Sequence, residues 1–162
     1  MSIEKVRKEF EALGIADRIL EFEISSATVE LAAVAVGVIP ARIAKTLSFM
    51  VNGNAVLVVT AGDAKVDNKK FKSFFGTKAK MLTPDEVDSL IGHSIGGVCP
   101  FAINPDIEVY LDISMERFES VFPACGSSNS AIEFTPQELF KYSKAKSWID
   151  VCKAWQEEQE VK

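Results

Sequence analysis

An Asn-Gly pair at positions 52 and 53 separates two strand-like runs, residues 44–51 and 54–61. Asn-Gly is the dipeptide preferred in two-residue hairpin turns, because both residues tolerate a positive φ angle. The two runs are therefore predicted to pair as neighbouring antiparallel strands. The remaining segments must then pack around this hairpin.

Helical patterns flank the hairpin on both sides. Apolar residues recur at helical spacing from Ile3 to Leu13, and residues 29–36 and 67–75 end at Gly37 and Gly76. Thr28 is a predicted N-cap, and two Thr-Pro pairs, at 83–84 and 135–136, are typical helix starts. The sequence thus predicts five helical segments.

Further strands are predicted at residues 19–24, 109–113, 119–123 and 131–134, whereas residues 148–152 fit a strand or a helix. Strands and helices interleave through irregular, hairpin-like connections. This order favours a mixed α/β domain over a doubly wound parallel sheet. The length of 162 residues favours a single domain spanning residues 1–162.

Composition excludes several classes of protein. The chain is 48% hydrophobic and 25% charged, which is ordinary for a globular protein. Because its net charge is −5, a nucleic acid is expected to bind only at a local positive patch. Three cysteines without a C-x-x-C pair argue against a disulfide framework or a cysteine zinc site, and they fit a cytoplasmic protein. Neither a signal peptide nor a membrane span is expected, and one histidine makes a metal site improbable.

Lys45 is the first candidate functional residue. Alternation along residues 44–51 places it on the apolar face with Leu47 and Phe49, opposite Thr46 and Ser48. A lysine on such a face either extends its ammonium group to solvent or holds it in a pocket with partners. Both alternatives remain open at this level.

Two loops are further candidates. Three glycines within residues 92–97 would let backbone N–H groups approach a ligand and form an oxyanion-binding surface, although a tight structural turn explains them equally well. The small polar residues of 125–130 are typical of turns. Cys99 and the single histidine, His93, could in principle form a nucleophile pair, but sequence proximity does not supply the geometry that such a pair needs.

Residues 65–80 carry six lysines and one acid, so that this segment is positive and the rest of the chain strongly negative. Phe71, Phe74 and Phe75 are predicted to face inward, with the lysines outside. The lysines form either a solvated face or a patch for a phosphate backbone.

Three motifs taken together resemble the YbaK/prolyl-tRNA-editing domain family. They are R-I-A-K-T-L at residues 42–47, G-G-V-C-P-F at residues 96–101, and Gly126-Ser127 followed by A-I-E-F-T-P at residues 131–136. The resemblance covers roughly residues 20–140 and includes the insertion domain of bacterial prolyl-tRNA synthetases. It implies a curved, barrel-like mixed sheet flanked by helices.

The resemblance also implies an activity, the deacylation of mischarged aminoacyl-tRNA. The expected substrate is tRNA-Pro carrying a wrong amino acid such as alanine or cysteine, without a cofactor, a membrane or DNA, and with prolyl-tRNA synthetase as an associated partner. The implied catalytic residues are Lys45, Gly96, Gly97, Val98, Cys99 and Pro100. The implied substrate-binding residues are Thr46, Phe101, Gly126, Ser127 and Ser128, and the tRNA contacts are assigned to Lys69, Lys70 and Lys72.

This sequence departs from the family pattern at two positions. Ser128 stands where some members carry histidine, and Cys99 stands where many carry serine. Two other functions therefore stay open: a non-catalytic module of the same fold that binds aminoacyl-tRNA or a nucleotide, and a hydrolase that depends on Cys99.

Overall fold

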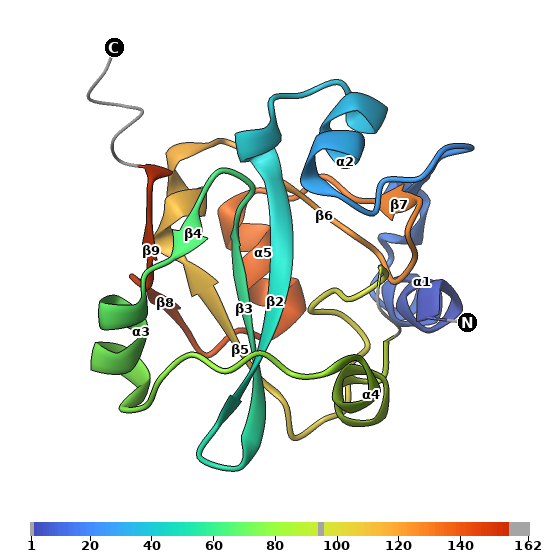
Figure 1. Cartoon of the computed structure of the whole chain (residues 1–162). Helices are drawn as coiled ribbons and strands as arrows, with labels where there is room; N and C mark the ends of the chain where they lie inside the picture. The colour runs from blue at the N-terminus through green and yellow to red at the C-terminus, as the bar shows by residue number, and fades with distance from the viewer. Residues whose placement is uncertain (1, 94–95, 156–162) are drawn as a thin grey trace.

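The hairpin predicted at Asn52-Gly53 is the centre of the sheet in the computed structural model, which describes residues 2–93 and 96–155 (Figure 1). Strands β2 (Ile43–Val51) and β3 (Asn54–Ala61) pair antiparallel, from Val51 opposite Asn54 to Ala44 opposite Ala61. Asn52 and Gly53 have φ angles of 50° and 83°, as the turn requires. The register predicted from the turn is thus confirmed.

The main sheet has the strand order β6-β2-β3-β5-β8. Strands β5 (Glu108–Asp112), β6 (Phe122–Pro123) and β8 (Ser147–Ile149) join it by parallel pairing, whereas β2 and β3 are antiparallel. Two short pairs stand beside it: β1 (Leu20–Glu21) with β7 (Ser130–Ala131), and β4 (Lys65–Val66) with β9 (Cys152–Lys153). The sheet is mixed and curled, so the predicted fold class is confirmed.

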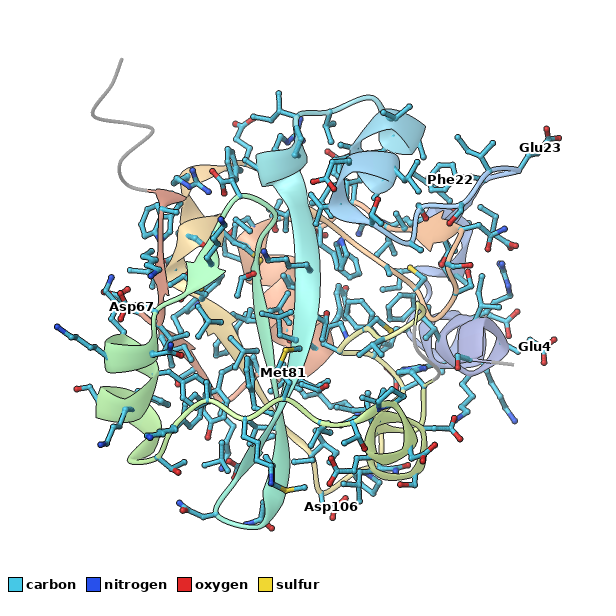
Figure 2. All side chains as sticks on the ribbon, viewed as in Figure 1. Glu4, Phe22, Glu23, Asp67, Met81 and Asp106 are labelled. Atoms are coloured by element: carbon cyan, nitrogen blue, oxygen red, sulfur yellow. The ribbon has the colours of Figure 1, made fainter. Side chains whose placement is uncertain are left out.

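The three helices that follow Thr28, Thr83 and Thr135 begin where the sequence predicts, and the helix predicted from Asp67 begins one residue later. The helices are α1 (Ser2–Ala12), α2 (Val29–Val36), α3 (Asn68–Phe75), α4 (Pro84–Glu86) and α5 (Pro136–Ser143). Thr28 accepts a hydrogen bond from the Leu31 N–H group, and Thr83 and Thr135 both form capping boxes. Asp67 caps α3 and is seen at its start in Figure 2.

Short helical turns connect several of these elements. A π-helical turn, Val87–Ile91, continues α4, and 3-10 turns cover Ala16–Arg18, Pro40–Arg42 and Ile113–Arg117. Among the described residues, no helix has the length and apolar character needed to cross a membrane.

Three predictions were wrong in extent. The strand predicted at residues 19–24 is reduced to β1, and the two predicted at 119–123 and 131–134 are reduced to β6, β7 and a single bridge between Val121 and Phe134. Residues 148–152 contain parts of two strands, because the chain leaves β5 after β8 and then pairs with β4 as β9. On α3, Phe71 is fully buried but Phe74 is 48% exposed, since its ring packs on the edge of Phe75 and Tyr110 at the surface.

An aromatic cluster anchors the glycine-rich loop to the core. The ring of Phe101, at the end of this loop, lies 5.0 Å from Phe10 of α1 and 5.7 Å from Phe134, measured between ring centroids. All three rings are fully buried. The loop therefore leaves the core at a fixed point, next to the open face of β2.

Candidate functional site

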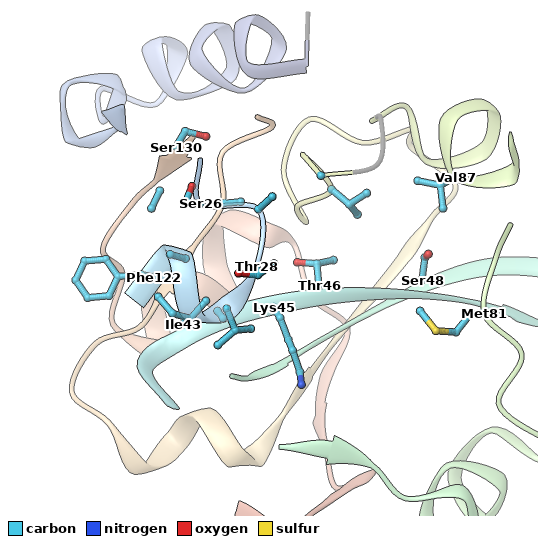
Figure 3. Close-up of a pocket in the computed structure, with 18 of the residues that line it drawn as sticks. Ser26, Thr28, Ile43, Lys45, Thr46, Ser48, Met81, Val87, Phe122 and Ser130 are labelled. Carbon is cyan, nitrogen blue, oxygen red and sulfur yellow. The ribbon is translucent and has the colours of Figure 1, made fainter. Parts of the chain in front are cut away.

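A cavity of about 250 Å³ lies against one face of β2 (Figure 3). The start of α2, the loop at Gly96 and Val98, and the segment from Met81 to Val87 enclose it, together with residues near β6 and β7. Met81, at the mouth, also forms a bridge with Phe49 and lies over β2 in Figure 2. The polar side chains among its described lining are those of Ser26, Thr28, Lys45, Thr46, Ser48 and Ser130.

Strand alternation decides which β2 side chains face this cavity. Thr46 and Ser48 point into it, whereas the side chain of Lys45 points to the other side of the strand (Figure 3). Ser48 is only 6% exposed, and no hydrogen bond to its hydroxyl group is found among the described residues. Two neighbouring hydroxyl groups are thus presented to a ligand from a rigid strand.

The glycine-rich loop and the Gly126-Ser127 segment, far apart in sequence, are in direct contact. A Cβ atom on Gly97 would stand 2.7 Å from the carbonyl oxygen of Gly126 and 3.1 Å from the Cα atom of Ser127. No side chain fits at that distance, so the close backbone approach requires glycine at position 97. The sequence predicted both motifs, and the structure brings them together.

The same contact continues into the N-terminal helix. A Cβ atom on Gly126 would stand 2.8 Å from the backbone of Ser2, and the φ angle of Gly126 is 95°. Ser127 donates a hydrogen bond to the Ser130 hydroxyl group over 2.8 Å, and the Ser128 carbonyl accepts one from the Ser26 N–H group. Gly126, Ser127 and Ser128 are absent from the described lining of the cavity; they support its walls.

Cys99 is fully buried behind the loop. Burial raises the pKa of its thiol to about 12, and the Sγ atom lies 3.6 Å from both the Phe101 carbonyl oxygen and His93 Nε2. The His93 ring, also buried, donates to the Phe101 carbonyl over 2.7 Å, and burial lowers its pKa. A protonated thiol without access to solvent is not a nucleophile, so this geometry argues against a Cys99-dependent hydrolase.

Pro100 and Phe101 also lie outside the cavity. Phe101 belongs to the core, and Pro100 lines a separate hollow near Glu9 and Lys146. Of the predicted loop residues, Gly96 and Val98 line the cavity directly. The C-terminal end of the loop is thus held in the core, and its earlier residues reach the cavity.

The Lys45 side chain is half-buried on the reverse face of β2. Burial lowers the pKa of its ammonium group, an effect that the nearby Cys152 and Asp63 partly offset. Within the described part of the chain, the ammonium group has no hydrogen bond or ion pair. An unpaired half-buried charge costs stability, which makes a purely structural role for Lys45 a poor explanation.

The lysines predicted to contact tRNA do not lie at the cavity. They belong to α3, which lies on the opposite side of the β2–β3 hairpin from α2 (Figure 1). Lys70 forms an ion pair with Asp150 at 3.0 Å and donates to the Cys152 carbonyl, whereas Lys69 and Lys72 are exposed. The three lysines therefore do not form one free patch.

Sequence reasoning missed several residues of the cavity. The alternation of side chains along β2 identified the face that carries Ser48, but it did not mark Ser48 as a site residue. Ser26 and Val87 carry no motif, Thr28 was predicted only as a helix cap and Ser130 only as part of a candidate turn, and only the tertiary fold brings them to the cavity.

Comparisons with known proteins agree with this architecture. A family model described as the aminoacyl-tRNA editing domain matches residues 25–142. The uncharacterized protein YwhH of Bacillus subtilis (strain 168) is 57% identical over 157 residues, which are 96% of this chain and all of that protein. A proline–tRNA ligase of Staphylococcus aureus (strain Newman) is 35% identical over 72 residues, which are 44% of this chain and 12% of the ligase.

A solved structure extends the match to the whole fold. It is a crystal structure provisionally described as a trans-editing enzyme for prolyl tRNA synthetase, with a TM-score of 0.85 and 30% identity. The alignment covers 94% of this chain and 98% of that one. The sequence motifs, the curled mixed sheet and the family match agree, and the chain belongs to the aminoacyl-tRNA editing domain family.

Proposed function

We propose that the chain is an aminoacyl-tRNA deacylase, which hydrolyses the ester between a wrongly attached amino acid and the terminal adenosine of a tRNA. One observation carries the proposal: the cavity joins the hydroxyl groups of Thr46 and Ser48 to the backbone of the Gly96–Val98 loop. A role on aminoacyl-tRNA would place the protein in the cytoplasm.

The chemistry follows from this arrangement. Water adds to the ester carbonyl carbon, and the negative charge that develops on the carbonyl oxygen is stabilised by loop N–H groups. The ester C–O bond then breaks, the ribose oxygen takes up a proton, and the free amino acid leaves. Glycine at position 96 leaves the backbone free of a side chain where the carbonyl has to approach.

A protein base is not required for this reaction. The described lining residues of the cavity include no carboxylate and no imidazole. An aminoacyl ester is already activated, and a water molecule or a group of the substrate itself can attack it. Thr46 and Ser48 can hold the attacking water or the amino group of the substrate by hydrogen bonds.

The cavity admits a small, uncharged amino acid side chain. Its volume is about 250 Å³, and the only charged residue in its described lining, Lys45, directs its side chain away from Thr46 and Ser48. Alanine, cysteine and serine fit such a site. An editing cavity of this kind acts as a second sieve, because one methylene group gives a synthetase only about 1–3 kcal/mol of discrimination.

The test is a deacylation screen of the purified protein. The substrates are tRNA-Pro charged with alanine, cysteine, serine or proline, together with the same amino acids on their own tRNAs. The sequence similarity to proline–tRNA ligases makes tRNA-Pro the first tRNA to examine. We expect hydrolysis of one or more small amino acids on tRNA-Pro and little hydrolysis of the prolyl ester.

A Cys99→Ser variant is the matched control in this screen. Because the thiol is buried and protonated, the variant should keep most of the activity. A wild-type protein that binds the charged tRNAs without hydrolysing any would indicate a binding module. Loss of activity in Cys99→Ser, matched by inactivation of the wild type on thiol alkylation, would support the cysteine mechanism.

A further inference from the structure

We propose that Lys65 of β4 and Lys153 of β9 form the surface that contacts the sugar-phosphate backbone of the tRNA. The proposal rests on the proposed function, since it names the partner of the same site. It differs from the sequence-based assignment of this role to α3.

The first observation is the pairing of the two strands. Lys65 and Lys153 are direct partners in the short antiparallel pair formed by β4 and β9, and both are exposed. Like charges that face each other across a two-strand ladder destabilise it. An anion held between the two ammonium groups would remove this repulsion.

The second observation concerns three acidic residues near this lysine pair, each of which already accepts hydrogen bonds from other residues. Asp63 accepts two hydrogen bonds from the Arg117 guanidinium group, one of 3.0 Å, and Asp150 pairs with Lys70. Asp67 accepts the N–H groups of Lys69 and Lys70 as the cap of α3.

The hydrogen bond from the Lys70 N–H group is the main cause that lowers the pKa of the Asp67 carboxyl group, and the charges of Lys153 and Lys70 contribute less; that carboxylate makes no ion pair with either lysine in the described structure. Within residues 2–93 and 96–155, Lys65 and Lys153 likewise have no ion-pair partner. In the described part of the chain, their positive charge is therefore not taken up by an ion pair.

The third observation connects this lysine pair to the cavity. Lys45 belongs to the part of β2 that lines the cavity, and its side chain extends toward the side of the strand where β4 lies (Figure 3). Burial is the main cause that lowers the pKa of the Lys45 ammonium group, and the charge of Lys65 lowers it further. The pair thus lies toward the Lys45 face of β2, which is the reverse of the face that Thr46 and Ser48 turn to the cavity, and Lys45, which also lines the cavity, connects the two (Figure 3).

The chemistry of the surface fits a nucleic-acid backbone. Two exposed ammonium groups suit neighbouring phosphates, and phosphate contacts do not depend on base sequence. A chain with a net charge of −5 can attract a polyanion only through such a local region. Each phosphate that is neutralised releases counterions, so binding through this surface must weaken with salt.

The test compares two double variants that have the same change in charge. Lys65→Glu/Lys153→Glu alters the proposed surface, and Lys69→Glu/Lys72→Glu alters two exposed lysines of α3. Binding of uncharged tRNA-Pro is measured by fluorescence anisotropy at several salt concentrations. KM and kcat are measured with aminoacyl-tRNA and with the corresponding aminoacyl-adenosine.

We expect Lys65→Glu/Lys153→Glu to weaken tRNA binding on the order of tenfold near 0.1 M salt, and to lower the salt slope by about 1.5. KM for aminoacyl-tRNA should rise by a similar factor, while hydrolysis of aminoacyl-adenosine should be unchanged. The Lys69→Glu/Lys72→Glu variant should change the tRNA affinity and the KM for aminoacyl-tRNA by less than about twofold. A Lys65→Ala/Lys153→Ala variant, with no reversed charge, should show a smaller loss in the same direction.

Several results would overturn the proposal. They are an unchanged affinity, an equal loss in both double variants, a larger loss in the α3 variant, or a wild type that does not bind tRNA. A loss on aminoacyl-adenosine as well would show damage to the cavity or the fold. Because uncharged tRNA is bound without any reaction, this assay can support the surface even if the deacylase proposal fails.

Discussion

Lys45 combines a position in the apolar half of β2 with a charge that the described structure leaves unpaired. Its neighbours on that face are Leu47 and Phe49, and Phe49 packs on Phe71 of α3. Burial lowers the pKa of its ammonium group. A residue selected only for stability would be apolar at this position, so we expect that function retains the lysine.

Lys45→Met should therefore raise the stability of the protein and abolish deacylation, because we expect the unpaired ammonium group to anchor the terminal nucleotide of the tRNA. We expect the free energy of unfolding to rise by about 0.5–1 kcal/mol at pH 7, measured by urea denaturation. Because the pKa is lower in the folded state than in the unfolded state, the cost of the charge is fully present below the folded pKa, decreases as the pH rises from the folded pKa, and is lost above the unfolded pKa. The gain in unfolding free energy of Lys45→Met over the wild type should accordingly become smaller in alkaline solution.

Lys65→Met is the matched control, because Lys65 is exposed on β4 and its charge is not buried. It should leave the hydrolysis of aminoacyl-adenosine unchanged. Full activity in a folded Lys45→Met protein would remove Lys45 from the mechanism.

Ser48 should control how large a side chain the cavity admits. Ser48→Val replaces the hydroxyl with a methyl group and adds a second methyl group at a buried position of the cavity wall. If the wild type accepts both alanine and cysteine, the variant should lose roughly tenfold or more in kcat/KM for the larger one relative to alanine. The measurement is the ratio of kcat/KM values for the two esters.

Ser48→Ala separates the two effects, since it removes the hydroxyl group without filling the cavity. If the volume of the cavity determines the preference, Ser48→Ala should leave the ratio of kcat/KM values unchanged or shift it in favour of the ester of the larger amino acid. The same loss in both variants would assign the effect to the hydroxyl group.

At the scale of elements, the cavity depends on contact between two loops and the N-terminal helix. Gly97 lies against the backbone of Gly126, and Gly126 lies against Ser2 at the start of α1. The loop is further anchored by Phe101, which packs on Phe10 of the same helix. The position of the proposed oxyanion-binding backbone is therefore set by elements at three distant places in the sequence.

Gly97→Ala should displace this loop and abolish activity in a folded protein. The added Cβ atom would stand 2.7 Å from the Gly126 carbonyl oxygen, so one backbone has to move. We expect a loss of about 1–3 kcal/mol in the free energy of unfolding and a loss of kcat that exceeds what unfolding explains.

Gly76→Ala is the control for the element-scale prediction. Gly76 also has a positive φ angle, 78°, but no atom lies within 4 Å of its added Cβ, and it ends α3 away from the cavity. This variant should lose about 1 kcal/mol of stability and keep its kcat. Similar activity in the two glycine variants would contradict the proposed role of the loop.

At the scale of the whole molecule, Arg117 joins the segment after β5 to the turn after β3. Its guanidinium group donates twice to Asp63 and once, over 2.8 Å, to the Ser114 carbonyl, and it stacks on Trp155. Both partners of the ion pair are 12% exposed. This contact ties the two parallel neighbours β3 and β5 together at one end of the sheet.

Arg117→Met should leave the Asp63 carboxylate buried without its partner and cost about 3 kcal/mol of unfolding free energy. Arg7→Met, which removes the exposed ion pair between Arg7 and Glu21, should cost less than about 1 kcal/mol. Urea denaturation of the two variants measures the difference. Equal losses of unfolding free energy would mean that the Asp63–Arg117 ion pair stabilises the fold no more than the exposed Arg7–Glu21 pair does.

Much of the local structure could be predicted from the sequence. The Asn52-Gly53 turn, the caps at Thr28 and Thr135, and the helix ends at Gly37 and Gly76 depend on residues a few positions apart. Alternation along β2 correctly separated Lys45 from Thr46. These features were predictable because hydrogen bonds and side-chain periodicity within one segment determine them.

The cavity and its charges were decided by the tertiary structure. Contact between Gly97 and Gly126, the partial exposure of Phe74, and the pairing of Lys70 with Asp150 all join segments that no local pattern relates. Strands as short as β4 and β9 have too few residues to show a period, so the meeting of Lys65 and Lys153 could not be predicted. The sequence alone determined the elements and the motifs. Packing between distant segments decided which motifs share one cavity and which lysines keep a free charge.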